Sequence, residues 1–392
     1  MALYHKHKCI MPTDQSVGFM SRRKEVPPLI EPRPEILSLP PYHPGRPTGV
    51  TPAINLAANE NAWGPSPRVA TAWQSLMSSE AVARYPDMEG LVLKETLGRV
   101  WGVPAETLLL GTGSGHLIKC LTETYLRPGD GVVTVFPTFS LYRQNAEMMG
   151  GRLSWLPGDG RHVDFSKLPA VVEKAKPRMV FLCSPNNPTG DLAPPRVIEE
   201  ILSVLGTDGL LVVDEAYADF ATTRPELMGT IAEKRSLAVL RTLSKAYGLA
   251  GLRVGALVAD PAVIEAVSRV REPFPVSAPA LAMGAAAISD EEYRSEVVAR
   301  VVQGRQRLER ELSERGWNVN RGEANFVWTA PGSAGAAGRL KAELAARGIL
   351  VRHGESFGAP DHLRVTVGTA TEIDTFLSVL DSILREWGEQ RE

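Results

Sequence analysis

The sequence predicts an α/β fold, in which helices cover a mainly parallel sheet, with a smaller α+β domain at the C-terminal end. The first observation is that short β-rich runs alternate with longer helical stretches from about residue 90, the pattern of repeated βαβ units. The second is the length of 392 residues, which suits two or more domains or one large α/β unit with an appendage. The third is that the alternation changes after a charged helix expected over 290–315.

Seven apolar runs are expected to form a seven-stranded sheet in a large domain that we place at 61–264. They are Leu108–Leu110, Val132–Phe136, Leu153–Leu156, Met179–Cys183, Leu210–Val213, Leu237–Arg241 and Val254–Val258. The helices expected around them are His116–Leu126, Phe139–Met149, Pro195–Leu205 and Pro261–Arg269. Because crossover helices cover both faces of a parallel sheet, the strands should be apolar throughout, as these runs are.

A smaller α+β domain is placed at 265–392, joined by an N-terminal segment at 36–60. Its expected elements are strand Asn325–Trp328, helix Arg339–Arg347, strand Leu363–Val367 and helix Glu372–Arg385, with the Gly/Ala run Pro331–Gly338 as a loop. Residues 1–35 are basic and proline-rich, which is typical of a flexible tail. His5 and His7 lie in this tail without a third ligand, so no metal site is predicted.

Composition excludes several classes of function. Lys and Arg number 43 against 45 Asp and Glu, so the chain lacks the cationic excess of a nucleic-acid-binding protein. No apolar run reaches the ~18 residues that span a bilayer, so no membrane partner is expected. Cys9, Cys120 and Cys183 follow no disulfide or zinc spacing. These features indicate a cytoplasmic protein.

Two loops that follow expected strands could present backbone or amide groups to a ligand. The glycine-rich turn Gly111–Gly115 lies between a strand and a helix, where free N–H groups suit a phosphate, although glycine also serves turn geometry alone. The loop Ser184–Gly190 contains two X-Pro bonds and would hold Asn187 rigidly at the end of a strand. A tight turn without a ligand is the alternative for that loop.

Two further segments carry charged groups to strand ends. Asp214 follows an apolar run, where a carboxylate needs a cation or hydrogen-bond donors, or serves as a helix cap. Lys245 lies in the apolar segment Thr242–Arg253, eight residues before an arginine. A buried lysine near another cation has a depressed pKa and can act as an amine nucleophile toward an aldehyde. A surface lysine is the alternative.

Together these segments resemble the pyridoxal-phosphate (PLP) aminotransferases of fold type I, the aspartate aminotransferase superfamily, and within it the histidinol-phosphate aminotransferase family. The resemblance runs from about Tyr42 to the C-terminus. It is carried by Asn59–Asn61 with Gly64–Pro67, Arg84–Pro86, Ser184–Gly190, Asp214–Tyr217, Arg241–Gly255 and Leu363–Thr369.

The resemblance implies roles around the cofactor ring. Lys245 matches the lysine that binds PLP covalently and moves a proton at the substrate carbon. Asp214 matches the partner of the pyridine nitrogen. Asn187 and Tyr217 match hydrogen-bond donors to the ring's 3′-oxygen, and Phe139 matches the aromatic side chain that stacks on the ring, with core packing as its alternative.

The resemblance also implies a phosphate site and a homodimer. Residues expected to bind the cofactor phosphate are Gly113, Ser114, Gly115, Thr242, Ser244 and Arg253. Tyr85 resembles the tyrosine that reaches the cofactor phosphate of the neighbouring subunit, which implies a homodimer with shared sites.

Substrate residues are implied in the same way. Arg364 matches the arginine that binds the α-carboxylate of glutamate and 2-oxoglutarate, and Arg352 matches a second arginine for the distal carboxylate or a substrate phosphate. Tyr42, Asn61 and Trp63 are further expected substrate contacts. Two departures from the family pattern stand out: Trp63 is larger than usual, and His116 replaces an acidic residue, where it either touches the cofactor or faces solvent.

The implied activity is ping-pong amino transfer between an amine donor and 2-oxoglutarate or glutamate, with histidinol phosphate as the expected amine. An aminotransferase for an aromatic or specialised amino acid is one alternative. A decarboxylase like the threonine-phosphate decarboxylases is another, because fold alone does not decide chemistry. A PLP-binding regulator is a third, but the tail before the matched region is too short for a DNA-binding module.

Overall fold

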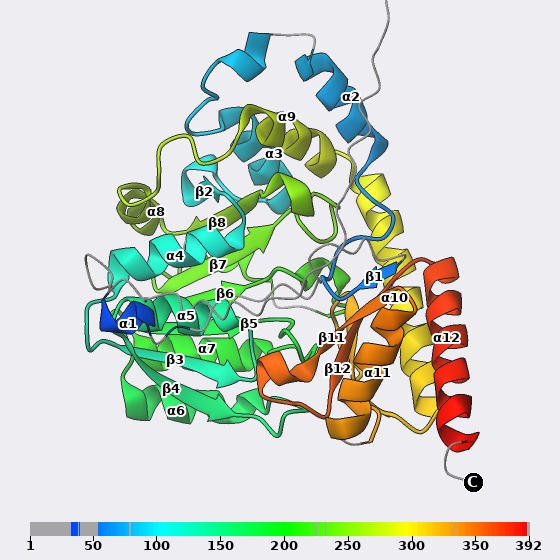
Figure 1. Cartoon of the computed structure of the whole chain (residues 1–392). Helices are drawn as coiled ribbons and strands as arrows, with labels where there is room; N and C mark the ends of the chain where they lie inside the picture. The colour runs from blue at the N-terminus through cyan, green and yellow to red at the C-terminus, as the bar shows by residue number, and fades with distance from the viewer. Residues whose placement is uncertain are drawn as a thin grey trace, which may run out of the picture.

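The computed structural model describes residues 33–37, 39, 54–77, 80–223, 226–231, 233–332 and 334–389. Within these ranges two sheets lie side by side, each covered by helices (Figure 1). Most of the expected N-terminal tail, and the expected substrate residue Tyr42, fall outside the described residues.

The larger sheet has seven strands in the order β2-β8-β7-β6-β5-β3-β4. Their bounds are β2 Leu108–Gly111, β3 Gly131–Phe136, β4 Arg152–Pro157, β5 Met179–Cys183, β6 Leu210–Asp214, β7 Leu237–Thr242 and β8 Gly255–Ala259. Neighbouring strands from β4 to β7 pair in parallel. This confirms the predicted seven-stranded, mainly parallel sheet. Strands β5, β6, β7 and β8 are buried along their whole length, because helices lie on both faces.

Strand β8 is the exception in direction, since it runs antiparallel to both β7 and β2. No crossover helix separates β7 from β8; the connection holds only the short 3-10 turn Ala250–Leu252. In the pairing register Thr242, the last residue of β7, faces Gly255, the first residue of β8. The start of β8 therefore lies at the edge of the sheet where the parallel strands end.

The smaller sheet has five strands in the order β1-β11-β12-β10-β9. They are β1 Ile54–Leu56, β9 Asn318–Val319, β10 Phe326–Ala330, β11 Ile349–His353 and β12 Leu363–Thr366. Strand β1 pairs in parallel with β11, and the other neighbours are antiparallel. The chain thus contributes its first described strand to a sheet whose other strands come from its C-terminal part.

Twelve α-helices lie in the described part of the chain. They are α1 Pro34–Leu37, α2 Pro67–Met77, α3 Leu91–Trp101, α4 Ser114–Tyr125, α5 Ser140–Met148, α6 Leu168–Ala175, α7 Pro195–Leu205, α8 Pro261–Ser268, α9 Ala278–Ile288, α10 Glu291–Glu314, α11 Ala334–Ala346 and α12 Ala370–Glu389. The long helix α10 is the predicted charged helix.

One expectation about the C-terminal half needs correction. The run Pro331–Gly338 was expected to be a loop, but α11 begins at Ala334. Three of the first five residues of this helix are alanine, the strongest helix former. Helix α9 packs against α2 and α3 beside the large sheet, and α8 packs on β8 and β2. The predicted domain boundary at residue 264 falls within α8 and stays a prediction.

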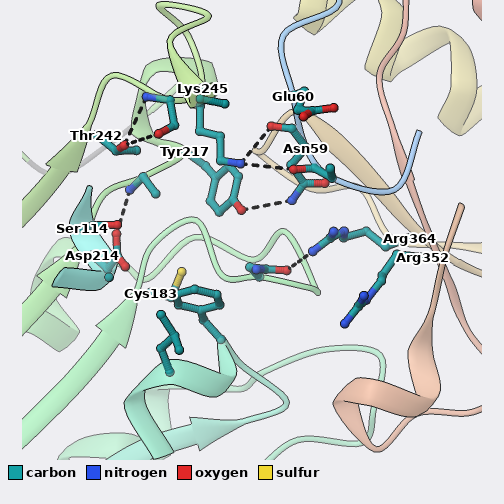
Figure 2. Close-up of a pocket in the computed structure, with 18 of the residues that line it drawn as sticks. Asn59, Glu60, Ser114, Cys183, Asp214, Tyr217, Thr242, Lys245, Arg352 and Arg364 are labelled. Carbon is teal, nitrogen blue, oxygen red and sulfur yellow. Dashed lines mark hydrogen bonds between the residues drawn. The ribbon is translucent and has the colours of Figure 1, made fainter. Parts of the chain in front are cut away.

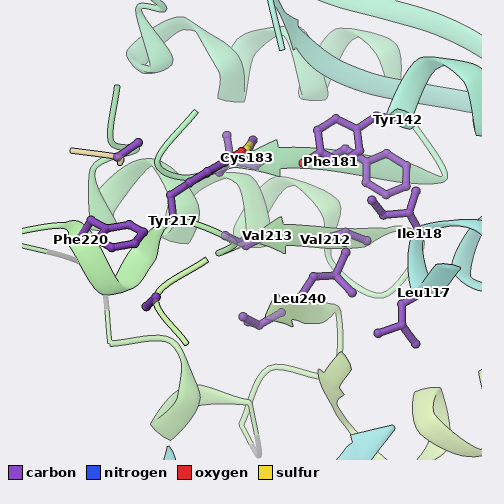
Figure 3. Packing of buried hydrophobic residues seen from close by; sticks show 14 of the residues in the cluster. Leu117, Ile118, Tyr142, Phe181, Cys183, Val212, Val213, Tyr217, Phe220 and Leu240 are labelled. Carbon is purple, nitrogen blue, oxygen red and sulfur yellow. The ribbon is translucent and has the colours of Figure 1, made fainter. Parts of the chain in front are cut away.

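The core is continuous beneath the large sheet. On one face the Tyr142 ring stacks on Phe181, with ring centroids 5.0 Å apart, and beside them Leu117 and Ile118 of α4 pack near Val212 and Leu240 (Figure 3). These side chains are essentially inaccessible to solvent. The strand ends that carry polar residues are therefore fixed by a close-packed layer. Among the described helices, none has both the length and the apolar character needed to cross a bilayer.

Candidate active site

A cavity of about 530 Å³ opens where the parallel strands of the large sheet end and faces strands β11 and β12 of the small sheet. Such an edge is where open α/β sheets place their ligands. Twelve of the residues expected from sequence line it: Ser114, Gly115, Phe139, Asn187, Asp214, Tyr217, Thr242, Ser244, Lys245, Arg253, Arg352 and Arg364. Gly113 lies directly beside this set, against Arg253.

Lys245 reaches into this cavity from the connection between β7 and β8 (Figure 2). Its ammonium Nζ donates to the carbonyl oxygen of Asn59 at 3.0 Å and to that of Ala58 at 3.3 Å. Burial, and next the positive charge of Arg364, lower the pKa of Lys245 to about 8. A sizeable fraction of the amine is therefore neutral near neutral pH, which is the form that attacks a carbonyl carbon.

Asp214 ends β6 at the floor of the cavity and is almost fully buried. Its Oδ2 accepts a hydrogen bond from the Tyr142 hydroxyl at 2.8 Å, and its Oδ1 accepts one from the Ala216 backbone N–H at 3.1 Å. Burial raises the pKa of Asp214 to about 6, while these two hydrogen bonds act in the opposite direction. A buried carboxylate of this kind gains most from a cationic partner. Sequence reasoning missed Tyr142, whose position seventy-two residues away carries no local signal.

Tyr217 and Asn59 form a second buried pair above the floor. The Asn59 amide nitrogen donates to the Tyr217 hydroxyl at 3.0 Å, and Thr366 fixes Asn59 by contacts to its backbone N–H and its amide oxygen. Burial raises the pKa of Tyr217 above its usual value, so the phenol keeps its proton. Because the hydroxyl already accepts from Asn59, its own O–H remains available to donate to a ligand oxygen. Asn59 belongs to a segment singled out in the sequence, but no role was assigned to it.

Arg253, with Gly113 beside it, places a positive charge at one end of the cavity. Arg253 donates to the Ala250 carbonyl oxygen at 3.1 Å and to the Ser244 hydroxyl at 3.4 Å. Gly113 has φ of 80°, and a Cβ atom there would come within 2.6 Å of the Arg253 guanidinium. The turn therefore requires glycine both for its backbone conformation and for the close approach of the arginine.

Arg364 and Arg352 form the opposite side of the cavity, on adjacent strands of the small sheet. They are register partners in the antiparallel pair β11–β12. Arg364 is 6% exposed and donates to Asn187 Oδ1 at 2.6 Å and to the Ala57 carbonyl oxygen at 2.7 Å. Arg352 is half-buried and donates through Nε to the Ser356 hydroxyl at 3.2 Å. The Phe357 ring lies within 6 Å of both guanidinium groups, so one aromatic side chain contacts both arginines.

Apart from Gly113, three expected site residues among the described ones do not line this cavity. The Asn61 amide donates to the Ala246 carbonyl oxygen and accepts from the Trp63 backbone N–H, which makes it a support for the segment that carries Lys245. Trp63 packs against the core. Tyr85 is 83% exposed and stacks on Phe274, with ring centroids 4.7 Å apart. The predicted substrate contacts of Asn61 and Trp63 therefore gain no support from the cavity of the same chain.

His116 also lies outside the cavity lining. Its imidazole bonds to the Thr112 backbone and to Cys120, so it neither touches the cavity nor simply faces solvent, which were the two sequence-based alternatives.

The donor set of the cavity fits PLP. A buried carboxylate suits the pyridine nitrogen, the Tyr217 hydroxyl suits a ring oxygen, Arg253 with the Gly113–Ser114 turn suits the phosphate dianion, and Lys245 suits the aldehyde. When bound, PLP supplies an electron-withdrawing ring that stabilises negative charge at the substrate carbon. The chain supplies binding, orientation and a proton-transferring amine at Lys245 Nζ.

Comparisons with known proteins agree with this chemistry. Residues 51–380 match the family model described as aminotransferase class I and II. The histidinol-phosphate aminotransferases of Moorella thermoacetica and Symbiobacterium thermophilum are each 37% identical to the chain; both alignments cover 90% of it, and they cover 92% and 99% of those two proteins. The crystal structure of histidinol-phosphate aminotransferase from Sinorhizobium meliloti in complex with pyridoxal-5′-phosphate superposes with a TM-score of 0.83 at 29% identity, covering 90% of this chain and 97% of that one.

These matches span nearly the whole described chain, and the expected catalytic lysine, aspartate and tyrosine share one cavity. The chain is therefore a PLP-dependent aminotransferase of fold type I and belongs to the histidinol-phosphate aminotransferase family.

Proposed function

We propose that this enzyme transfers the amino group of histidinol phosphate to 2-oxoglutarate in a ping-pong cycle. The observation that carries the proposal is the pair Arg352 and Arg364, side by side on β11 and β12 across the cavity from Asp214. In a ping-pong enzyme one site receives both substrates in turn. Two neighbouring guanidinium groups can bind the two carboxylates of 2-oxoglutarate and, in the other half-cycle, the phosphate of the amine.

Lys245 is proposed to move the proton of the reaction. Its Nζ, with the pKa lowered to about 8, takes a proton from the carbon of the amine donor in the first half-reaction. In the second half-reaction it returns a proton to the corresponding carbon of the oxo acid. Ala58 and Asn59 lie in the segment that follows β1. Their carbonyl oxygens accept hydrogen bonds from the Lys245 amine and so hold it in the cavity. The names of the relatives support the choice of amine, and Trp63, whose size suggested an aromatic substrate, lies outside the cavity lining.

A single-turnover absorbance experiment tests this proposal. The PLP-loaded protein is mixed with histidinol phosphate and no oxo acid, and the spectrum is followed as the cofactor gains the amino group. Conversion at micromolar donor, reversed by 2-oxoglutarate, is the expected result. Conversion by glutamate but not by histidinol phosphate would keep the aminotransferase and reject the amine, and release of carbon dioxide from an amino acid phosphate would favour the decarboxylase alternative.

We also propose that the enzyme works as a homodimer in which Tyr85 completes the neighbouring site. Tyr85 does not line the cavity of its own chain and is largely exposed. The part of the sequence around it, residues 73–92, holds other exposed apolar side chains, namely Trp73, Met77, Met88, Leu91 and Val92. An apolar area of this kind is typical of an interface between subunits. Light scattering is expected to give twice the 42.5 kDa chain mass, and a monomer with full activity would reject the proposal.

The proposed compartment is the cytoplasm. Cys120 and Cys183 are free and buried, and neither has a disulfide partner among the described residues, which suits a reducing environment. Cell fractionation with an antibody to the chain tests this assignment, and recovery in a membrane or extracellular fraction would reject it.

A further inference from the structure

His116 lies at the third position of helix α4 and bonds back to the glycine-rich turn that precedes the helix. Its Nδ1 is 3.1 Å from the Thr112 backbone nitrogen. Thr112 is followed by Gly113, and Ser114 begins α4. This arrangement is similar to the hydrogen bond that a glutamate or glutamine at the third helical position usually accepts from the N-cap N–H, except that Thr112 lies one residue before the N-cap Gly113. Here an imidazole does this.

The hydrogen-bond partners fix the protonation state of this imidazole. A backbone N–H can only donate, so Nδ1 must accept and cannot carry a proton. The ring proton then lies on Nε2, which is 3.4 Å from the sulfur of Cys120. Burial raises the pKa of Cys120 to about 11, so this sulfur stays a thiol and acts as a weak acceptor. Only the neutral form of His116 can therefore accept the hydrogen bond from the Thr112 backbone N–H.

The same turn is also held by the loop between α8 and α9. Arg271 donates to the Leu110 carbonyl oxygen at 3.1 Å, and the Thr112 hydroxyl donates to the Pro275 carbonyl oxygen at 2.7 Å. On its other side, Gly255 lies so close that a Cβ atom there would come within 2.6 Å of the Ser114 backbone nitrogen. The turn is thus contacted by His116, by the loop between α8 and α9, and by the start of β8. Among these contacts, His116 is the residue whose charge changes when the solution becomes more acidic.

We propose that His116 is a positioning residue for the cofactor phosphate: it holds the Thr112–Ser114 turn in the conformation that aims backbone N–H groups and Arg253 at that phosphate, and it releases the turn when protonated. The proposal rests on the assignment of this turn to the PLP phosphate, but not on the identity of the amine substrate. His116 does not line the cavity, so its effect reaches the cofactor through Thr112.

Several charged groups face His116 and set how readily it takes a proton. Lys119 and Glu123 lie on its own helix, and Arg271 and Glu272 lie on the facing loop. Burial is the largest influence and lowers the pKa of His116 from its usual 6.5. The side chain is therefore a neutral acceptor at neutral pH, and protonation in mildly acidic solution turns Nδ1 into a donor that faces another donor.

The test measures the dissociation constant of PLP from the apoenzyme at about pH 7.5 and about pH 5.5, by absorbance and fluorescence titration. Three proteins are compared: wild type, His116→Ala, which removes the acceptor, and His116→Gln, which keeps an acceptor that does not titrate. Pyridoxal, which lacks the phosphate, is titrated into each protein as a second ligand. Each pH is compared across the three proteins, so that the pH dependence of Lys245 chemistry cancels.

At about pH 7.5 we expect His116→Ala to weaken PLP binding by about threefold to tenfold, the range for loss of one N-terminal side-chain hydrogen bond, and His116→Gln to stay within about twofold of wild type. As the pH is lowered and His116 takes up a proton, PLP binding by wild type should weaken toward that of the alanine variant, while His116→Gln should not follow. Pyridoxal binding should be equal in all three proteins, and kcat at saturating PLP should be unchanged.

Equal PLP affinity of wild type and His116→Ala would overturn the proposal, as would a glutamine variant as weak as the alanine variant. Equal weakening of pyridoxal binding would also overturn it, because the effect would then not act through the phosphate. If His116→Ala does not fold, the pH dependence of wild type against His116→Gln decides alone. A failed conversion of histidinol phosphate would leave all of these outcomes intact.

Discussion

The two sides of the active-site cavity are built differently. On the large-sheet side Asp214 and Tyr217 contact the buried side chains of Tyr142 and Asn59, and Lys245 donates to the backbone carbonyl oxygens of Ala58 and Asn59. On the small-sheet side Arg364 is buried and donates hydrogen bonds to Asn187 and to the Ala57 carbonyl oxygen, but Arg352 next to it is half-buried and contacts a short turn, Gly354–Phe357. Asp214 and Tyr217, which we expect to contact the cofactor, are thus buried, whereas Arg352, one of the two arginines proposed to bind the substrate, is only half-buried.

This difference separates the residues proposed to act in the chemical step from the residues proposed to select the substrate. Groups that act in every half-cycle must keep one geometry and one protonation state, which close packing provides. A site that receives two differently shaped anions in turn needs one fixed contact and one adaptable contact. The predictions below alter first the large-sheet side and then the small-sheet side, and end with a residue behind the cavity floor.

Lys245→Ala is expected to have the largest effect. Loss of the amine should reduce kcat by at least about 10³-fold, because no other amine lines the cavity within the described residues. The fold should survive, since Lys245 lies at a strand end and contributes little to the core. Single-turnover absorbance measures the rate, and the thermal unfolding midpoint provides the control. Turnover close to wild type would contradict the assigned role.

Asp214→Asn should lower kcat by about 10²-fold or more while changing substrate KM little, because the carboxylate acts on the charge of the cofactor ring and not on substrate binding. Steady-state kinetics with saturating PLP measures both constants. A rise in substrate KM of similar size, with kcat unchanged, would place Asp214 in substrate binding instead.

The same variant tests the cost of burying Asp214. Because the folded-state pKa is raised to about 6 from 3.8, the folded cofactor-free protein binds more protons than the unfolded chain between these values, so stability falls as pH rises through this window. Above pH 6 the full cost applies, about 3 kcal/mol at 1.36 kcal/mol per pKa unit. Asp214→Asn should therefore raise the unfolding free energy of the cofactor-free protein at about pH 8, and the gain should vanish below about pH 4.

Arg364→Lys should raise KM for 2-oxoglutarate by about tenfold to a hundredfold. A lysine cannot bond Asn187 and Ala57 and also form a bidentate pair with a carboxylate. The matched control is Arg352→Lys, on the adaptable side, which should cost less. Equal effects of the two substitutions would remove the distinction between a fixed and an adaptable arginine.

Tyr142→Phe should give the smallest effect, about threefold to tenfold in kcat, from the loss of one hydrogen bond to Asp214. The ring still stacks on Phe181, so the core is kept. Because the Tyr142 hydrogen bond lowers the pKa of Asp214, its loss should move the acidic limb of the rate profile to higher pH. A pH–rate profile identical to wild type would exclude this role for Tyr142.

The sequence predicted the large sheet well because each of its strands is an apolar run bounded by glycine, proline or polar residues. Strands β1, β9 and β11 of the small sheet were missed. Strands β1 and β9 are short, with three and two residues, and β1 and β11 pair with each other from opposite ends of the chain. Local pattern does not carry such pairing.

The site shows the same division. Residues in motifs at strand ends, such as Asp214 and Lys245, were predicted, because strand ends of one sheet meet in space. Tyr142 and Asn59 were not assigned, because their roles depend on partners that only the folded chain brings near. His116 was noticed as a departure, but its partner Thr112 became visible only in the geometry of the turn.

The reversed direction of strand β8 has a consequence for engineering. Since the chain turns from β7 into β8 without a crossover helix, Lys245 and Arg253 lie on one short connection, 243–254. An exchange of this connection between related proteins would therefore transfer together the lysine and the arginine that we expect to bind the PLP aldehyde and phosphate. Asp214 and the two arginines proposed to bind the substrate would stay with the recipient, so we expect such chimeras to vary cofactor retention independently of substrate choice.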